Sequence, residues 1–359
     1  MIGMWRSRMG DDSEDRRPAM DGLRAIACLI VLIIHMASLS TDYDDVLRGI
    51  GKIGVWLFFV LSAFLLSMQL LNTGPSPGSL ARYAIRRALR ILLPFSTAVI
   101  VYRLFGTLGI DDWETAIEVL TFQSPAGHLW TVPPEFMFYF ALPPILFACL
   151  ATLDRWGAQS ALCLMLLILG VFSVMWPPLR TPESSMWFGW YIATFCSGLC
   201  AAVAIFSFPH PNSRTTSLGA GLAITSLLGF TVAAKFGAFG DPRDVLLNKH
   251  FIFGPLWAVF IYCLSVGGSV WQKFMANRFM MLIGRSSYSI YLFHFLIEVW
   301  AIRLLPAWIA FFLGIGLSIL AGIIGFWILE RPTYWLRARI EAAVFTPSTR
   351  VQPYGAAQD

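Results

Sequence analysis

The chain has 359 residues, of which 57% are hydrophobic, 15% aromatic and only 13% charged. Soluble globular domains carry about 25% charged residues, so this composition excludes an ordinary soluble protein and indicates a membrane protein. Apolar runs recur from one end to the other and leave no stretch for a separate soluble core. The net charge of +5 does not indicate nucleic-acid binding, because basic residues in so apolar a chain mark the cytoplasmic side of the membrane.

Ten apolar segments are each close to the ~20 residues that a helix needs to cross a bilayer. We therefore predict an all-α fold, a polytopic membrane bundle of about ten transmembrane helices. It forms one domain, residues 21–335, between tails at 1–20 and 336–359. The predicted segments are residues 23–40, 53–71, 91–110, 133–152, 158–176, 187–208, 218–234, 251–271, 282–302 and 307–329.

The distribution of Lys and Arg predicts the orientation, because cytoplasmic loops retain an excess of these residues. With both termini inside, 18 of the 26 basic residues lie on the inner side. An even number of spans places both termini together, so we expect both to be cytoplasmic. The first segment also resembles a secretory signal, but its length and the span that follows at once favour an uncleaved helix.

The first predicted helix contains a histidine that a simple anchor does not need. His35 follows Arg24 by eleven residues, about three helical turns, so the two side chains share a face about 16 Å apart. Asp21 precedes Arg24 by three residues, a spacing at which the two can pair. Ionisable groups at membrane depth by default face a cavity or a partner. His35 is therefore a candidate general base, with a structural contact between helices as an equal alternative.

Two later segments also place ionisable side chains in or beside predicted spans. The stretch "GHLWTVPPEFMFYF" puts His128 and Glu135 around a Pro-Pro break at the outer entrance of the fourth span, where broken helices line cavities. Its aromatic residues, Trp130 among them, also fit an interfacial belt. The stretch "GRSSYSIYLFHFLIEVW" puts His294 in mid-span and Glu298 one turn further along the same face. Each could be a polar contact between helices, but three such sites in one bundle indicate a function.

A basic cluster precedes the third predicted span on its cytoplasmic side. Four arginines lie within nine residues: Arg82, Arg86, Arg87 and Arg90. Retention of positive charge and attraction to anionic lipids explain most clusters of this kind. Alternatively, guanidinium groups bind phosphate oxygens in pairs. Taken alone, the cluster favours the lipid interpretation.

Other chemistry has little support in the sequence. The six cysteines lie in apolar stretches without CxxC spacing, which predicts core residues and no structural disulfide. No Walker loop, GxGxxG fingerprint, HExxH motif or GxSxG elbow occurs in a usable context. We therefore predict no bound metal and no bound cofactor.

Five motifs follow one another along the chain, and "LERP" comes after the last span: "DGLRAIACLIVLIIH", "GKIGVWLFFVLSAFLLS", "RRALRILLP", "HLWTVPPEFMFYFALP" and "SYSIYLFHF". Together they resemble the membrane-bound acyltransferase 3 family, from Asp21 to about Pro332. Two departures stand out: Ala63 replaces a usual glycine, which should affect packing only, and "VPPEF" keeps one carboxylate, Glu135. The second departure counts against any mechanism that needs two adjacent glutamates.

The resemblance implies an integral membrane O-acyltransferase and gives roles to particular residues. His35 becomes the catalytic general base, with Glu135 as the second catalytic group, and the basic cluster becomes a site for CoA phosphates. The donor-binding residues that it implies are Arg24, Arg86, Arg87 and Arg90. The acceptor-side or supporting residues that it implies are Asp21, His128, Trp130, Tyr288 and His294.

The partners implied by the resemblance are acyl-CoA, most simply acetyl-CoA, as co-substrate and an extracytoplasmic carbohydrate as acceptor. Such acceptors include lipopolysaccharide O-antigen, capsule and other envelope polysaccharides, which implies a bacterial inner membrane. One alternative is a transporter or export component, since intramembrane histidines and carboxylates also form proton pathways; the two halves show no internal repeat, which counts against it. The other is an acyltransferase for a lipid or small molecule.

Overall fold

The computed structural model describes residues 18–74, 76–208, 211–266 and 270–344, and in these ranges it is all-helical. The longer helices are α2 (Pro18–Ser40), α4 (Ile50–Thr73), α5 (Pro77–Phe105), α7 (Val132–Met175), α8 (Ile192–Ser207), α9 (Ser213–Lys235), α10 (His250–Ser265), α13 (Ser287–Leu304), α14 (Ala307–Gly325) and α15 (Arg331–Val344). Shorter elements are α3 (Asp44–Leu47), α6 (Trp113–Leu120), α11 (Val270–Met275), α12 (Arg278–Arg285), the 3-10 turns η1 (Gly127–Thr131), η2 (Pro178–Arg180), η3 (Phe188–Tyr191) and η4 (Val245–Asn248), and the π-helical segment η5 (Phe326–Glu330).

The predicted polytopic helical bundle is confirmed. Within the described residues, seven helical segments are long and apolar enough to cross a membrane. Each of the ten predicted segments overlaps a helix. Helix α7 accounts for two of them: it breaks at Gly157, where φ is 81°, and its two halves are the fourth and fifth segments. The predicted start of the third segment is wrong: α5 begins at Pro77, where the Ser76 hydroxyl accepts from the backbone N–H of Ser79. Hydropathy misses this first part because it carries the basic cluster.

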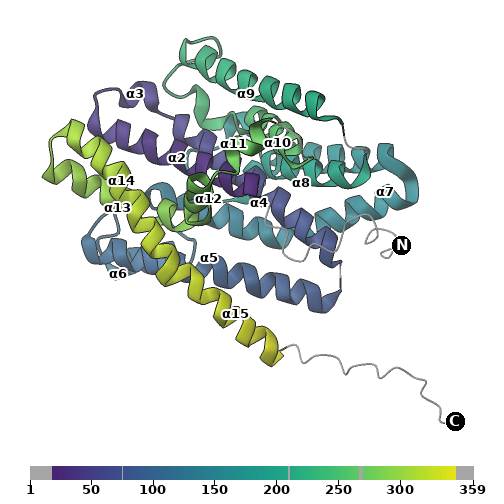
Figure 1. Cartoon of the computed structure of the whole chain (residues 1–359), viewed down its shortest axis with the longest axis horizontal. Coiled ribbons are helices and arrows are strands. Elements are labelled where there is room, and N and C mark those ends of the chain that lie inside the picture. Colours follow the sequence, from purple (N-terminus) through teal and green to yellow (C-terminus); the bar gives the residue numbers. More distant parts are fainter. Residues whose placement is uncertain (1–17, 75, 209–210, 267–269, 345–359) are drawn as a thin grey trace.

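The helices run lengthwise through the bundle, with α9 along one edge and α15 along the other (Figure 1). α2 begins and α15 ends toward the end of the bundle that lies away from α3 and α6, as an even number of crossings requires (Figure 1). We name this the inner end, because we predict it to face the cytoplasm, and we name the opposite end, with α3 and α6, the outer end. The predicted tails themselves, 1–17 and 345–359, lie outside the described residues.

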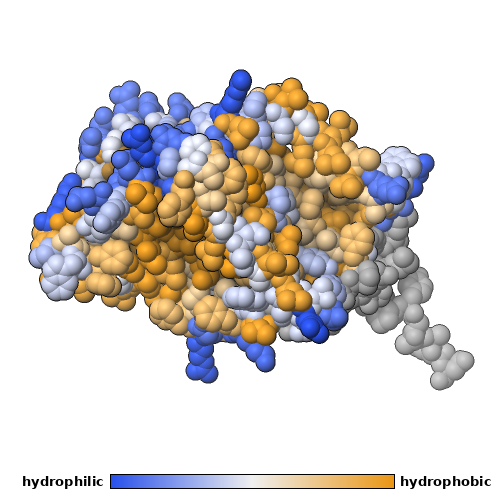
Figure 2. Space-filling model, turned by 90° about the horizontal axis from the view of Figure 1, so that it is seen from above, coloured by the Kyte–Doolittle hydropathy of each residue, from blue (hydrophilic) through white to orange (hydrophobic). Residues whose placement is uncertain are grey.

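The surface between the two ends is largely apolar. Figure 2 shows broad hydrophobic areas over the body of the bundle, with hydrophilic areas gathered toward its ends. Large apolar side chains are exposed on several helices, such as Leu166 on α7, Leu222 on α9 and Phe312 on α14. Exposed apolar side chains carry no free-energy penalty when the hydrocarbon of a membrane surrounds them.

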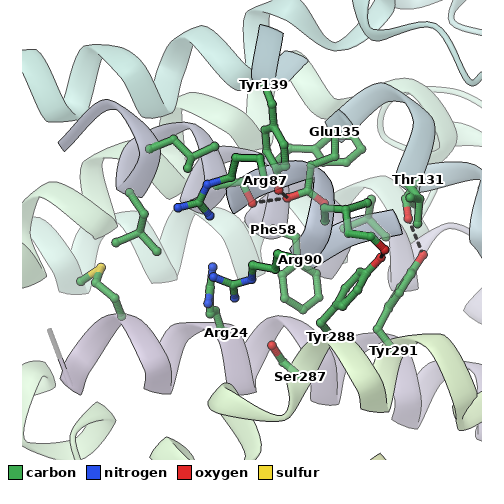
Figure 3. Close-up of a pocket in the computed structure, with 18 of the residues that line it drawn as sticks. Arg24, Phe58, Arg87, Arg90, Thr131, Glu135, Tyr139, Ser287, Tyr288 and Tyr291 are labelled. Carbon is green, nitrogen blue, oxygen red and sulfur yellow. Dashed lines mark hydrogen bonds between the residues drawn. The ribbon is translucent and has the colours of Figure 1, made fainter. Parts of the chain in front are cut away.

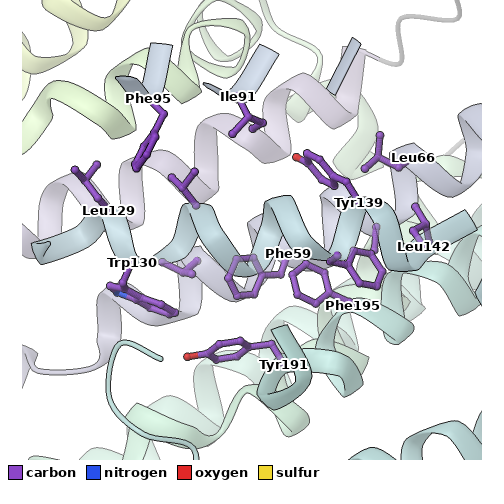
Figure 4. Packing of buried hydrophobic residues seen from close by; sticks show 14 of the residues in the cluster. Phe59, Leu66, Ile91, Phe95, Leu129, Trp130, Tyr139, Leu142, Tyr191 and Phe195 are labelled. Carbon is purple, nitrogen blue, oxygen red and sulfur yellow. The ribbon is translucent and has the colours of Figure 1, made fainter. Parts of the chain in front are cut away.

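The core is organised around α4, which packs against α2, α7, α8 and α10. Phe195 of α8 stacks on Phe138 of α7 with 4.1 Å between ring centroids. It also stacks on Phe59 of α4 with 4.7 Å between centroids (Figure 4). Trp130 and Tyr191 extend this aromatic cluster toward the outer end (Figure 4). Offset aromatic pairs add to the energy of burial and hold the helices in register.

Glycines let the helices approach one another closely at two points that matter for the site. A Cβ on Gly198 would lie 2.1 Å from the carbonyl oxygen of Val60, beside Ala63 on α4. A Cβ on Gly284 would lie 1.8 Å from the carbonyl oxygen of Asp21, so α12 lies against the inner end of α2. Small residues at helix interfaces allow this packing in membranes.

Replacing Gly198 by alanine should destabilise the bundle, because the added methyl group meets the backbone of α4. Overpacking of this kind costs about 1–3 kcal/mol, so thermal unfolding of purified protein in detergent should occur at a lower temperature. Gly170→Ala on α7 is the matched control, since a Cβ there has no neighbour within 4 Å. Alanine favours helix over glycine, so this control should keep or raise the unfolding temperature; an equal fall in both variants would contradict the assigned contact.

Candidate active site

Two cavities enter the bundle from opposite ends, and residues of α2, α4, α5, η1, α7 and α13 line them. The inner cavity has a volume of about 320 Å³ and includes Arg24, Arg87 and Arg90. The outer cavity has a volume of about 590 Å³ and includes His35, His128, Trp130 and Lys52. Most of the candidate residues from the sequence therefore line one of these two spaces.

The inner cavity concentrates positive charge. Figure 3 shows the guanidinium groups of Arg24 and Arg90 close together, with Arg87 directed into the same space. Arg87 donates to the Oε1 atom of Gln69 at 2.5 Å and lies over the ring of Tyr83. Among the described residues, no carboxylate lies within ion-pair distance of any of the three arginines. A buried cation without a counter-ion is costly, so the inner cavity suits an anionic ligand.

Two other charged groups near the inner cavity form ion pairs of their own. The Nε and Nη2 atoms of Arg86 donate to the two oxygens of Glu341 on α15, at 2.6 and 2.7 Å. Arg86 thus lies outside the inner cavity, unlike its neighbour Arg87. Asp21 contacts Arg285 of α12 at 3.3 Å, where the sequence spacing had suggested Arg24 as its partner.

Glu135 lies in the inner cavity rather than beside His35. It accepts hydrogen bonds from the hydroxyl groups of Ser62 and, at 2.6 Å, Tyr139 (Figure 3). Tyr288 lines the same cavity and donates to the carbonyl of Ile91 at 3.0 Å. Two hydroxyl donors can stabilise one carboxylate, so Glu135 holds its position without the second glutamate that the family pattern would supply.

The outer cavity combines aromatic side chains with charges of both signs. The Nζ atom of Lys52 lies 5.4 Å from the centre of the Trp130 ring. Arg48 contacts Glu183 at 3.0 Å and Asp244 at 3.3 Å at the rim. Such a mixture of an aromatic face with hydrogen-bonding and charged groups suits a polar, uncharged or weakly charged ligand.

Three histidines meet at the inner wall of the outer cavity. The Nδ1 atom of His35 lies 2.9 Å from the Nε2 atom of His294, and their rings are stacked at 5.2 Å. His128 lies 4.6 Å from His294 and 6.3 Å from His35 between ring centroids. Neither ring nitrogen of His128 has a hydrogen-bond partner among the described residues.

The hydrogen bonds fix the tautomers of two of these histidines. The Nδ1 atom of His294 lies 2.7 Å from the backbone carbonyl of Tyr291, which can only accept. In a neutral ring, the Nε2 atom of His294 then holds a lone pair and accepts the hydrogen on Nδ1 of His35. The lone pair of His35 is consequently on Nε2, which lies 3.9 Å from where a Cβ on Gly51 would be, at the lining of the outer cavity.

The same cluster includes a buried carboxylate. Glu298 is fully buried, and neither of its oxygens has a hydrogen-bond partner among the described residues. His35, His294 and Glu298 each offer one ligand atom, and these atoms lie within 4.8 Å of one another, so they could hold a metal ion. A metal on Nδ1 of His35 would place hydrogen on its Nε2, so metal binding and a basic Nε2 exclude one another. The absence of a metal stays a prediction.

Some residues of the site were not singled out from the sequence. Gly51 and Lys52 line the outer cavity, and Ser62 and Gln69 line the inner cavity. All four are on α4, whose apolar and small residues suggested packing alone. The one usable signal was Lys52 itself, a charge directly before the predicted span 53–71.

Comparisons with known proteins agree with this geometry. The profile of the acyltransferase domain family matches residues 17–331. A provisionally named O-acetyltransferase, SACOL0978 of Staphylococcus aureus strain COL, is 25% identical over 374 aligned positions, which cover 92% of this chain and 59% of that protein. O-acetyltransferase OatA of S. aureus strain NCTC 8325 is 26% identical over 312 positions, covering 79% of this chain and 50% of OatA.

The chain thus spans between half and three fifths of the length of these relatives. No solved structure matches it. The family profile covers most of the chain, including every helix that lines the two cavities. The chain belongs to the acyltransferase 3 family.

Proposed function

We propose that this protein is a membrane O-acetyltransferase that moves an acetyl group from cytosolic acetyl-CoA to a hydroxyl group of an extracytoplasmic carbohydrate. The observation that carries the proposal is the pair of cavities from opposite ends, one cationic and one polar, on either side of a histidine with a free lone pair. The names of the S. aureus relatives support O-acetyl transfer, and their bacterial source supports an envelope carbohydrate as acceptor.

The inner cavity would take the donor. Arg24, Arg87 and Arg90 have no carboxylate partner among the described residues, so the phosphates of CoA would supply the missing negative charge. The pantetheine arm then extends along α2 toward His35, over about 16 Å for the eleven residues from Arg24. The charged end of CoA stays at the inner end throughout.

The outer cavity would take the acceptor. Trp130 offers a face for a sugar ring, and Lys52, Arg48 and Glu183 offer hydrogen bonds to its hydroxyl groups. A hydroxyl next to Gly51 reaches the Nε2 atom of His35 without a side chain in between.

The reaction follows from the tautomers. His35 Nε2 removes the proton as the acceptor oxygen attacks the thioester carbonyl carbon, forming the new C–O bond. The C–S bond breaks, and the thiolate of CoA takes the proton from His35 to leave as a thiol. His294 is a positioning residue: its Nε2 atom accepts from His35 and orients the ring, and positive charge that develops on His35 is shared along this hydrogen bond.

His35→Ala should lower acetyl transfer in membranes by at least ~100-fold, because a general base contributes a factor of about 10²–10⁴. The assay measures radiolabelled acetyl groups passing from acetyl-CoA to envelope carbohydrate. Ser38→Ala, in the same cavity and on the same helix, should retain most of the activity. Full activity of the His35 variant would refute the assigned role.

Arg87→Gln should raise the KM for acetyl-CoA by about 10- to 100-fold, because a hydrogen bond to a charged group contributes about 1.5–3 kcal/mol. The KM for the acceptor should change little. Arg86→Gln is the matched control, since Arg86 is paired with Glu341 outside the cavity. If both variants alter the KM for acetyl-CoA equally, the cluster acts through lipid attraction instead.

Purified protein should contain far less than one equivalent of zinc, iron or manganese per chain, because the proposed chemistry needs the Nδ1 atom of His35 bonded to His294. Elemental analysis by mass spectrometry measures this directly, and activity should survive dialysis against EDTA. A stoichiometric metal that Glu298→Gln removes would show that the cluster is a metal centre.

A further inference from the structure

The inner and outer cavities meet at a shared wall. Val55 of α4 and Tyr291 of α13 belong to the linings of both. Both residues are only 6% exposed, and they are the two that the linings share. The direct route from the arginines to His35 therefore runs past these two side chains.

The Tyr291 side of this wall is held in place. Its hydroxyl donates to the carbonyl oxygen of His128 at 2.5 Å and accepts from the hydroxyl of Thr131 at 2.8 Å. Its ring lies edge-on to Phe58 at 6.1 Å and to His128 at 5.2 Å. A ring tied at its tip and packed against two others cannot swing aside without losing both hydrogen bonds.

The Val55 side is also stiff, because a β-branched side chain in a helix has one strongly preferred rotamer. Val55 follows Gly51 by four residues, which places it one turn, about 6 Å, closer to the inner end. Gly51 is the residue beside His35 Nε2. The wall therefore lies on the path from the donor to the base, one helical turn before the base.

We propose that Val55 and Tyr291 form a constriction that selects the donor by the width of its acyl group, so that acetyl and other unbranched short acyl groups pass and branched ones do not. This inference rests on the proposed function. The acyl group is the leading end of an acyl-CoA that enters from the inner cavity, and it has to pass the constriction before its carbonyl carbon reaches His35. A second methyl group next to the carbonyl widens this leading end, whereas a longer unbranched chain does not.

The test compares three donors on each protein: acetyl-CoA, n-butyryl-CoA and isobutyryl-CoA. The last two have the same atoms and differ only in branching. Acyl transfer to envelope carbohydrate is measured by mass spectrometry, with release of CoA as a second readout. The quantity that decides is the ratio of isobutyryl to n-butyryl transfer within one preparation, because this ratio does not depend on how much of a variant is folded.

We expect the wild-type protein to transfer isobutyryl at least about tenfold less well than n-butyryl, the scale on which a pocket discriminates one methyl group. Val55→Ala should raise the ratio about tenfold, and Val55→Leu should lower transfer from all three donors. Val60→Ala is the matched control: the same change on the same helix, at a buried residue that lines neither cavity.

Three results would overturn the proposal. Equal ratios in the wild-type protein and Val55→Ala would show that this wall does not select the acyl group. The same rise in Val60→Ala would assign the effect to general loosening of α4. In both cases acyl transfer itself persists and the proposed function stands. A wild-type protein that transfers none of the three acyl groups would overturn the proposed function and this inference together.

Discussion

The chemistry proposed for this protein depends on one hydrogen bond, from Nδ1 of His35 to Nε2 of His294. It leaves a lone pair on His35 Nε2 only because the carbonyl of Tyr291 has already fixed the hydrogen on the other nitrogen of His294. The hydrogen-bonded groups, two imidazole rings and one backbone carbonyl, are neutral in this arrangement. They can therefore lie at membrane depth without the cost of an isolated charge. Tyr291 has two roles in this arrangement. Its backbone sets the tautomers, and its side chain forms one side of the wall between the cavities.

The inner and outer ends of the bundle differ in how their charged groups are paired. Three arginines face the inner cavity without a carboxylate partner among the described residues, whereas Arg48 at the rim of the outer cavity pairs with Glu183 and Asp244. Unpaired guanidinium groups make an empty inner cavity unfavourable, and a ligand with several phosphates removes this penalty. The outer cavity has no such demand. The two ends therefore suit ligands of different chemistry, as the function that we propose requires.

Much of the fold followed from the sequence, because hydropathy and helix length are local properties. Each of the ten predicted segments overlaps a helix, and Arg24 and His35 lie on one continuous helix, α2. The ion-pair partners of the charged residues were not predicted, because they depend on which helices pack together. Asp21 pairs with Arg285 of α12, and Arg86 pairs with Glu341 of α15. Sequence spacing can find a partner one turn away, but it carries no signal for one that follows after more than two hundred residues.

The placement of Glu135 and His294 shows the same limit at the site. Both were recognised as polar residues at membrane depth, yet their depth alone did not say which cavity each would line. Glu135 lies with the arginines, and His294, expected as a structural contact, bonds directly to His35.

The wall between the inner and outer cavities also bears on the barrier between the two compartments. A passage wide enough for all of CoA would also conduct water and ions, whereas a wall of valine and tyrosine needs to admit only the acyl group and the narrow uncharged arm that carries it. The width that we infer to select the acyl group is thus also the width that keeps the membrane sealed.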